Sequence, residues 1–297
     1  MHDRNITQRK NMSTIKIGWI GLGKMGVPMA ENLIKSGLPV SVYNRNKAKE
    51  EELLAKGAQT APSPAALIEQ SDVVIVMVSD DRAIHAVFLG EDGLLSAKTS
   101  GKTIINMSTV SSAISREMSI LCSNQNNHYL DAPVSGSVKQ AESAQLVIMV
   151  GGEENVYENV KEILEKLGKL TLLVGGAGAG NAAKLAVNSM IGFYTQGLSE
   201  AILFAKKNDI KIDDFLTIIN NGALANVYTK TKGDAILNNN FEPAFYLKHI
   251  YKDLGLARDQ GLDTPLGEAA YESFRQAEKT LGDEDLIAII KHLDSSK

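Results

Sequence analysis

IKIGWIGLGKMG, residues 15–26, is a short apolar run that leads directly into the pattern G-x-G-x-x-G, and a helical pattern follows to Lys35. In such a unit Gly21 allows a tight turn, Gly23 lets the backbone approach a phosphate, and Gly26 lets the helix pack on the strand. The first N–H groups of the helix then face the anion. The stretch predicts a pyrophosphate site for a dinucleotide, and a plain structural turn is the alternative interpretation. The cofactor-binding residues would be Gly21, Leu22, Gly23, Lys24, Met25 and Gly26.

Beyond this stretch, the first half of the chain alternates between strand-like and helix-like segments. Continuous apolar runs suit strands that are covered on both faces, and alternating βα units predict a mainly parallel, doubly wound sheet. We therefore expect a Rossmann-type α/β domain. The strand-like runs lie at residues 15–20, 38–43, 73–78, 103–107, 146–150 and 170–174, and helical patterns lie at 47–56, 64–69 and 112–123.

The pattern changes after residue 180. Residues 181–207 read as one long interdomain helix, and the chain onward to His292 is helical with Gly or Pro breaks. We expect an all-α domain at residues 177–297, after an α/β domain at residues 14–176. GGAGAG at residues 175–180 also joins a strand to a helix, which makes a second nucleotide site conceivable. No second strand with a ribose-binding residue follows at the required distance, so a flexible link is the better interpretation.

Composition narrows the class of protein. Of the 297 residues, 44% are hydrophobic and 22% charged, which is typical of a globular protein with a sizeable core. The net charge of −4 and the lack of a long basic run argue against nucleic acid as a partner. A single cysteine, Cys122, excludes an intrachain disulfide and fits a reducing cytosol. The histidines at positions 2, 85, 128, 249 and 292 show no paired spacing, so we expect no metal site.

The sequence also bears on location. No segment has the apolar length needed to cross a membrane, and residues 1–12 lack the apolar core of a secretory signal. We therefore expect a cytoplasmic protein that does not associate with membranes. Residues 1–13 would form a disordered leader, of which residues 1–11 would be dispensable, and Met12 is an alternative to Met1 as the start of translation.

The end of the second strand indicates the nicotinamide cofactor. An NAD-binding fold has an Asp or Glu there that holds the ribose hydroxyls. In this chain the run at 38–43 ends in Asn44 and Arg45, so no carboxylate would repel a 2′-phosphate. The guanidinium of Arg45 can bind that phosphate and lie against the adenine, which favours NADP(H). The alternative is an ordinary surface arginine.

Four further motifs follow in order: MST at residues 107–109, DAPVSG at 131–136, GAGNAAK at 178–184 with Asn188, and KDLGLA at 252–257. Together with GLGKMGVPMA at 21–30, they resemble the β-hydroxyacid dehydrogenase family, to which 3-hydroxyisobutyrate dehydrogenase is related. The resemblance extends from residue 15 to residue 293. The pair Asn44-Arg45, FEPAFYLKH at 241–249 and GDED at 282–285 most resemble its glyoxylate/succinic semialdehyde reductase branch. The chain departs from the family pattern at Ala144 and Gln145, where Gly and Thr are usual.

The resemblance implies that Lys184 is the catalytic residue. A helical lysine is by default a solvated surface residue, and without the resemblance we would prefer that interpretation. Near the start of a long helix, however, the positive helix end and partial burial are expected to lower the pKa of this lysine. Such a lysine can donate a proton to a carbonyl oxygen. Asn188 lies four residues later on the same helix face, where it can orient the lysine or bind substrate.

The resemblance also implies the other members of the site. The hydroxyl of Ser135 and the backbone near it suit a substrate carboxylate, and Thr109 follows a strand at the carboxyl edge of the sheet, where ligands of open α/β sheets bind. Without the resemblance, residues 131–136 would be interpreted as a plain turn, Phe245 as a core aromatic residue, and Lys252 with Asp253 as a surface ion pair. The implied substrate-binding residues are Ser135, Gly136, Asn188, Phe245 and Asp253. The implied cofactor-binding residues, besides the glycine turn, are Asn44, Arg45, Val78, Ser79, Thr109 and Lys252.

These expectations define one function and its rivals. The resemblance implies an NADPH-dependent reductase of small aldehydes that carry a carboxylate, such as glyoxylate or succinic semialdehyde, with Lys184 as proton donor. It also implies a homodimer or homotetramer. One alternative is 3-hydroxyisobutyrate dehydrogenase or another β-hydroxyacid dehydrogenase that works in the oxidative direction. The other is a catalytically inactive scaffold that binds the cofactor, which the presence of Lys184 argues against.

Overall fold

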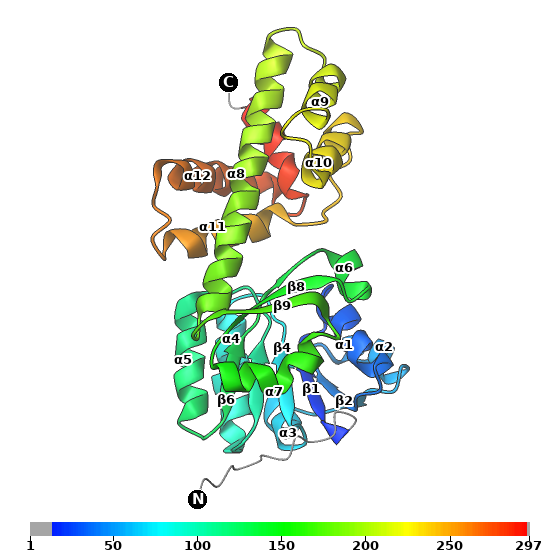
Figure 1. The fold of residues 1–297 in the computed structure, drawn as a ribbon, viewed down its shortest axis with the longest axis vertical. Coiled ribbons are helices and arrows are strands. Elements are labelled where there is room, and N and C mark those ends of the chain that lie inside the picture. The colour runs from blue at the N-terminus through cyan, green and yellow to red at the C-terminus, as the bar shows by residue number, and fades with distance from the viewer. Residues whose placement is uncertain (1–13, 296–297) are drawn as a thin grey trace, which may run out of the picture. The chain divides into compact units, whose positions relative to one another are not determined.

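The computed structural model describes residues 14–295, and the chain divides into two compact units (Figure 1). The first unit ends at Lys184 and the second begins at Leu185. Helix α8 (Ala179–Lys207) contains this division and begins two residues before the expected residue 181. The expected leader, residues 1–13, lies outside the described residues.

A single sheet organises the first unit. Within residues 14–295, nine strands lie in the order β3-β2-β1-β4-β5-β6-β8-β7, and β9 pairs with β8. Neighbours from β3 to β6 are parallel, as are β8 and β9. The predicted Rossmann-type sheet is therefore confirmed. The strands are β1 (Ile17–Ile20), β2 (Val40–Tyr43), β3 (Gln59–Thr60), β4 (Val73–Val76), β5 (Thr103–Asn106), β6 (His128–Asp131), β7 (Val134–Ser135), β8 (Leu146–Gly151) and β9 (Gly168–Gly175).

Helices cover both faces of this sheet, because strand residues on both faces are apolar and need cover. One core layer, around Trp19, joins the sheet to α1 (Gly26–Lys35), α2 (Glu51–Leu54), α6 (Val138–Glu142) and α7 (Glu154–Leu164). The other layer, around Phe88, joins it to α3 (Pro64–Glu69), α4 (Asp81–Leu89) and α5 (Ser112–Ser123). Short 3₁₀ turns are η2 (Lys47–Lys49) and η3 (Leu94–Ala97).

Side-chain caps begin the helices of one layer. The side chains of Ser63, Asp80 and Ser111 accept backbone N–H groups at the starts of α3, α4 and α5. Helix α1 differs, because no side chain of the described residues caps its start and its first turn has no acidic residue. The N–H of Val27 donates to the carbonyl of Gly23 at 3.1 Å and Pro28 has no N–H, so what this helix start offers a ligand is the backbone before Val27, with no side-chain cap to compete.

The β6–β8 region departs from the parallel pattern. Strand β8 runs antiparallel to both β6 and β7, because the short helix α6 turns the chain back between β7 and β8. The sequence predicted neither β6 nor β7. Strand β7 is only two residues long, and β6 begins with the exposed His128, so neither gives an apolar run.

The second unit consists of helices, as predicted. Besides most of α8, it contains α9 (Ile212–Asn220), α10 (Val227–Leu237), α11 (Leu247–Arg258), α12 (Pro265–Leu281), the 3₁₀ turn η4 (Leu286–Ala288) and α13 (Ile289–Ser295). Helices α11 and α12 pack around Phe274, and a second core forms around Ile202 of α8. Among the described residues, no helix combines the length and apolar character that a membrane span requires.

Candidate functional site

The glycine turn has the geometry that the sequence predicted for a phosphate cradle. Gly21 has φ +99°, and a Cβ there would lie 2.0 Å from the carbonyl oxygen of Met77. A Cβ at Gly26 would lie 2.1 Å from the carbonyl oxygen of Gly21. A Cβ at Gly23 would meet no atom within 4 Å, so this backbone is open to a ligand. Open backbone before an uncapped helix start fits the pyrophosphate of a dinucleotide.

The strand order places this turn at the switch point of the sheet. Strands β2 and β4 flank β1 on opposite sides, so the connections from this point run in opposite directions. Ligands of open α/β sheets bind at such a point, beyond the carboxyl ends of the strands. The predicted cofactor residues Val78, Ser79 and Thr109 follow β4 and β5 at this edge. The N–H of Val78 donates to Ser108 Oγ at 2.9 Å, which ties these two strand ends together.

Asn44 and Arg45 follow the end of β2. The side chain of Asn44 is hydrogen-bonded within the protein, whereas that of Arg45 can bind a ligand. Asn44 Oδ1 accepts the N–H of Leu22 at 3.0 Å, and its Nδ2 donates to the carbonyl of Asn46 at 2.8 Å. Asn44 therefore braces the glycine turn with its whole amide group. Arg45 is exposed, and no hydrogen bond or ion pair within the described part of the chain engages its guanidinium. That cation can bind an anionic ligand.

Glu50 is a carboxylate near this strand end that the sequence analysis missed. Its Oε1 accepts the N–H of Asn44 at 2.7 Å and faces the ammonium of Lys47 at 2.9 Å. Because Glu50 is buried and engaged in this way, it does not take the place of the acidic residue that holds ribose hydroxyls in NAD-binding folds. It instead fixes the loop that carries Arg45.

A hollow of about 430 Å³ borders the glycine turn. Its walls include Gly23 and two lysines, Lys24 and Lys49, and opposing carboxylates from Glu31 and Glu52. Glu31 is engaged by Lys35 at 2.7 Å and by Lys56 at 2.8 Å, and Lys56 also lies 2.8 Å from Glu52. The hollow therefore combines two lysines with two carboxylates, Glu31 and Glu52, that already have lysine partners, and Glu142 also lines it.

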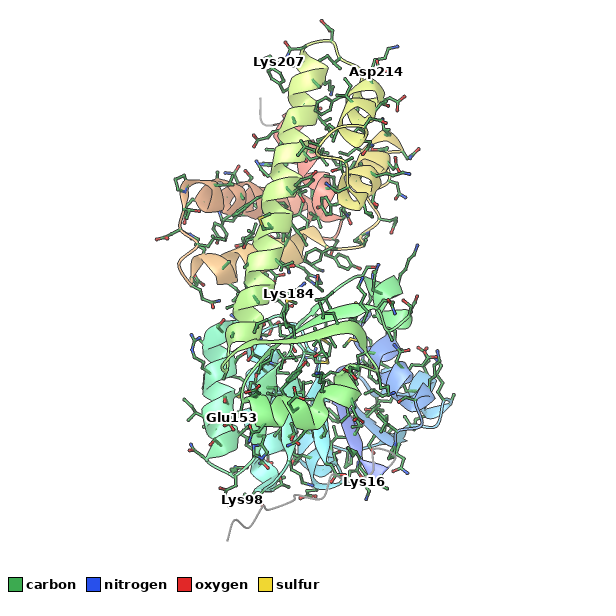
Figure 2. The ribbon with its side chains drawn as sticks, in the orientation of Figure 1. Lys16, Lys98, Glu153, Lys184, Lys207 and Asp214 are labelled. Atoms are coloured by element: carbon green, nitrogen blue, oxygen red, sulfur yellow. The ribbon has the colours of Figure 1, made fainter. Side chains whose placement is uncertain are left out.

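Lys184 lies in the second turn of α8, half-buried, and the start of that helix is fixed to the sheet (Figure 2). The carboxylate of Asp131, fully buried at the end of β6, accepts the N–H of Gly178 at 2.7 Å and that of Asn181 at 2.8 Å. Burial raises the pKa of Asp131 above its ordinary value, and these N–H donors act in the opposite direction. Asp131 thus satisfies the positive end of α8 from within the protein.

Asp131 alters the electrostatic surroundings expected for Lys184. From the sequence, the positive helix end and partial burial were the influences expected to act on its ammonium. The structure adds a buried carboxylate at the same end, so the helix field that reaches Lys184 is offset.

Ser135 and Gly136 lie where β7 ends, next to β8. Ser135 is half-buried and pairs with Val147 in the sheet, and Gly136 is exposed with φ +144°. The departure from the family pattern at Ala144 lies in the same hairpin. Ala144 has φ +53°, a left-handed conformation that glycine adopts without strain, so the loop keeps a shape suited to the usual glycine.

In the second unit, three predicted residues form one cluster. Asn188, 1% exposed, donates through Nδ2 to Asp253 Oδ2 at 2.6 Å, and the ammonium of Lys252 lies 3.2 Å from Asp253 Oδ1. Since a carboxylate can only accept, this bond fixes the orientation of the Asn188 amide. Asn188 Oδ1 is buried and has no hydrogen-bond partner among the described residues, so it is an acceptor suited to a ligand or ammonium.

Phe245, the remaining predicted residue, is half-buried at the start of α11 and is held by a group the sequence analysis missed. Asp285 Oδ2 accepts the N–H groups of Ala244 at 3.0 Å and Phe245 at 3.3 Å. Asp285 Oδ1 forms a buried ion pair with Lys232 at 2.7 Å. The GDED motif contains Asp285, so the motif was visible in the sequence but its contact with the Phe245 segment was not.

The structure therefore brings the predicted residues together as two sets. The first unit contains the glycine turn, the strand-end residues, the Ser135 hairpin and Lys184, and the second contains the Asn188 cluster and Phe245. Every predicted site residue lies within the described chain.

Comparisons with known proteins extend over both units. The model for the NAD-binding domain of 6-phosphogluconate dehydrogenase matches residues 16–176, and the NAD-binding model of NADP-dependent 3-hydroxyisobutyrate dehydrogenase matches residues 178–293. The chain is 35% identical over 288 residues to glyoxylate/succinic semialdehyde reductase 1 of Arabidopsis thaliana, across 95% of this chain and 100% of that protein. It is also 35% identical over 294 residues to the chloroplastic reductase 2 of the same plant, across 97% of this chain and 82% of that protein.

One solved structure shows the same architecture. The 3-hydroxyisobutyrate dehydrogenase of Mycobacterium tuberculosis aligns with a TM-score of 0.87 and 29% identity, across 94% of this chain and 99% of that chain. The similarity therefore includes the sheet unit and the helical unit.

Proposed function

The chain belongs to the β-hydroxyacid dehydrogenase family, which includes the 3-hydroxyisobutyrate dehydrogenases, and from this premise we propose that it is an NADPH-dependent reductase of small aldehydes that carry a carboxylate. As a member of this family it is an NAD(P)-dependent oxidoreductase that acts on a small molecule. Two relatives are named glyoxylate/succinic semialdehyde reductases, and these names support the proposed substrate class.

The observation that carries the choice of cofactor is the end of β2. Arg45 is exposed there with a guanidinium that no described residue engages, while the nearby carboxylate of Glu50 is buried and bound to Asn44 and Lys47. A cation without a competing carboxylate favours a ribose 2′-phosphate over free ribose hydroxyls. The uncapped start of α1 would hold the pyrophosphate.

The chemistry is divided among the remaining residues. Bound NADPH would supply the hydride. Lys184 would donate the proton that the carbonyl oxygen requires as it becomes a hydroxyl. Ser135 and the backbone of Gly136 would bind the substrate carboxylate, and the open acceptor of Asn188 would receive a hydrogen bond from the ammonium or the new hydroxyl. By the family resemblance, Phe245 and Asp253 of the second unit would bind the substrate, and Lys252 would bind the cofactor.

A second candidate is oxidation of a β-hydroxyacid, supported by the similarity to 3-hydroxyisobutyrate dehydrogenase. The same residues serve it in reverse, with Lys184 as proton acceptor. Arg45 weighs against those members of the family that use NAD. The homodimer or homotetramer and the cytoplasmic location expected from the sequence belong to this proposal as well.

Replacement of Arg45 by Asp tests the cofactor assignment. The wild-type protein should reduce glyoxylate or succinic semialdehyde with kcat/KM at least about tenfold higher for NADPH than for NADH. Arg45→Asp removes the partner of the 2′-phosphate and adds repulsion, so NADPH should lose about 2–3 kcal/mol of binding free energy. Steady-state rates with both cofactors and titrations of cofactor binding measure these effects.

Lys98→Asp is the matched control, because it makes the same change of charge in the same unit at an exposed loop before β5 (Figure 2). It should leave the cofactor preference unchanged. Equal efficiency of wild-type protein with NADPH and NADH, or an equal loss in both variants, would refute the assignment. Oxidation of hydroxyacids with no reduction of either aldehyde would favour the second candidate.

A further inference from the structure

Asn181 is fully buried in the first turn of α8, and each of its polar groups is engaged with a different element of the first unit. Its Oδ1 accepts the N–H of Val110 at 2.9 Å. Its Nδ2 donates to Ser115 Oγ of α5 at 3.1 Å, and its backbone N–H donates to Asp131 Oδ2 at 2.8 Å. No role in the chemistry is assigned to this residue by its motif position.

The bond to Val110 has the clearest consequence. Val110 directly follows Thr109, which lies at the carboxyl edge of the sheet beside the proposed cofactor cleft. Lys184 lies three residues after Asn181 and therefore on the same face of α8. One amide group thus links the turn that carries Thr109 to the helix that carries Lys184.

Asn181 itself does not reach a substrate, because it is fully buried and its amide oxygen and nitrogen are both bound. Its effect must therefore pass through the backbone that it holds. We propose that Asn181 is a positioning residue that keeps the Thr109 turn and Lys184 in register, so that hydride and proton reach the same carbonyl. This inference rests on the proposed function. Displacements of about 1 Å in such a geometry lower rates by about 100-fold.

The variants Asn181→Ala and Ser115→Ala separate this role from a structural one. Both remove a buried hydrogen bond from the same cluster, so both should lower the melting temperature. Asn181→Ala frees the Val110 N–H, whereas Ser115→Ala leaves the Val110 bond in place. Asn181→Leu removes the same bond with little loss of side-chain volume, and serves if the alanine variant does not fold.

The main measurement is single-turnover hydride transfer at saturating NADPH and aldehyde. Asn181→Ala should lower that rate by at least about tenfold, with the Kd of NADPH and the KM of the aldehyde changed by less than about threefold. Ser115→Ala should keep a rate within about threefold of wild type. With 4-deuterated NADPH, the isotope effect on kcat should rise in Asn181→Ala, because hydride transfer becomes rate-limiting. Amide exchange at Val110 should accelerate in Asn181→Ala and Asn181→Leu but not in Ser115→Ala.

Two outcomes would overturn the inference in an active enzyme. One is a wild-type hydride-transfer rate in folded Asn181→Ala or Asn181→Leu, and the other is an equal loss in Ser115→Ala. Unchanged exchange at Val110 would overturn the link itself, whatever the activity. The wild-type protein is assayed first. If it reduces no aldehyde, the proposed function is refuted, and this result is distinct from any difference between the variants.

Discussion

At the scale of single residues, the proposed chemistry depends on Lys184 and on groups that act through the backbone around it. Lys184 is half-buried in α8, the first turn of which is bound by Asp131 and Asn181. These contacts fix the backbone at the start of α8, and with it the position from which the long side chain of Lys184 extends. They also distinguish Lys184 from the lysines at the other end of the same helix, such as Lys207 (Figure 2).

Lys184→Met should abolish most of the activity while the fold and NADPH binding survive. Methionine keeps most of the aliphatic volume but has no proton to donate, and general acid catalysis typically contributes about 10²–10⁴ in rate. Single-turnover hydride transfer at saturating NADPH and aldehyde should therefore slow by at least about 100-fold. Lys207→Met, in the last turn of the same helix, is the control and should leave the rate unchanged. A near wild-type rate in Lys184→Met would show that Lys184 is an ordinary surface lysine.

The residues that sequence could and could not predict differ in the range of their contacts. The shape of the glycine turn and the place of Arg45 at the end of β2 were predictable, because both follow from local backbone shape and from distance along one βα unit. Asp131 contacts Gly178 across 47 positions and Asp285 contacts Ala244 across 41. Such partners become visible only when the fold brings them together. The substrate and cofactor roles of the site residues stay predictions.

At the scale of elements, two of the three glycines of α8, Gly180 and Gly197, lie in opposite surroundings. A Cβ at Gly180 would lie 2.5 Å from the carbonyl oxygen of Met149 and 2.6 Å from that of Asp131, so this glycine lets the helix start approach the sheet. A Cβ at Gly197 would meet no atom within 4 Å. The same helix therefore has one glycine required by a close contact and one that only weakens it.

Alanine substitutions should separate these two glycines. Gly180→Ala should lower the free energy of unfolding by about 1–3 kcal/mol, because backbone atoms on β8 and β6 must move. Gly197→Ala should raise it by about 0.5–1 kcal/mol, because alanine loses less conformational entropy in a helix. Chemical denaturation of both variants measures the two changes. Equal effects of the two substitutions would contradict the close approach at Gly180.

Elements were predictable where the pattern was long or strongly apolar. Buried strands such as β1 and β4, and helices such as α3 and α5, matched their predicted segments, although strand ends shifted by one or two residues. Strands β3, β6 and β7 were missed. Strand β3 has two exposed residues, β6 is short with a polar end, and β7 is held by pairing with β8 rather than by its own sequence.

At the scale of the whole molecule, the chain is two compact units that share one helix, and the proposed cofactor contacts lie mostly in the first. A ligand that binds the native state protects the part of the structure that must be folded to hold it. The glycine turn, Arg45 and Thr109 all belong to the first unit, and of the cofactor residues only Lys252 belongs to the second.

NADPH should therefore protect the two units unequally. At about 100 times its Kd, a ligand stabilises the binding-competent state by about 2.7 kcal/mol. Bound NADPH should therefore slow amide hydrogen exchange, measured by mass spectrometry, in peptides of residues 14–184. Peptides of residues 185–295 should show a smaller decrease in exchange rate. The Arg45→Asp protein at the same NADPH concentration is the control and should show little protection. Equal protection of both units would mean that they unfold as one cooperative body.

The carboxylate at the start of α8 has a consequence for how ligands are sorted. The chain has two glycine-rich turns that lead into long helices, one before α1 and one before α8. At α8 Asp131 acts as a tethered anion, and tethering gives it an effective concentration on the order of millimolar or above. A free phosphate compound must compete with that built-in anion, whereas at α1 no side chain of the described chain competes. Competition by the protein's own carboxylate thus directs a dinucleotide to one of two similar turns.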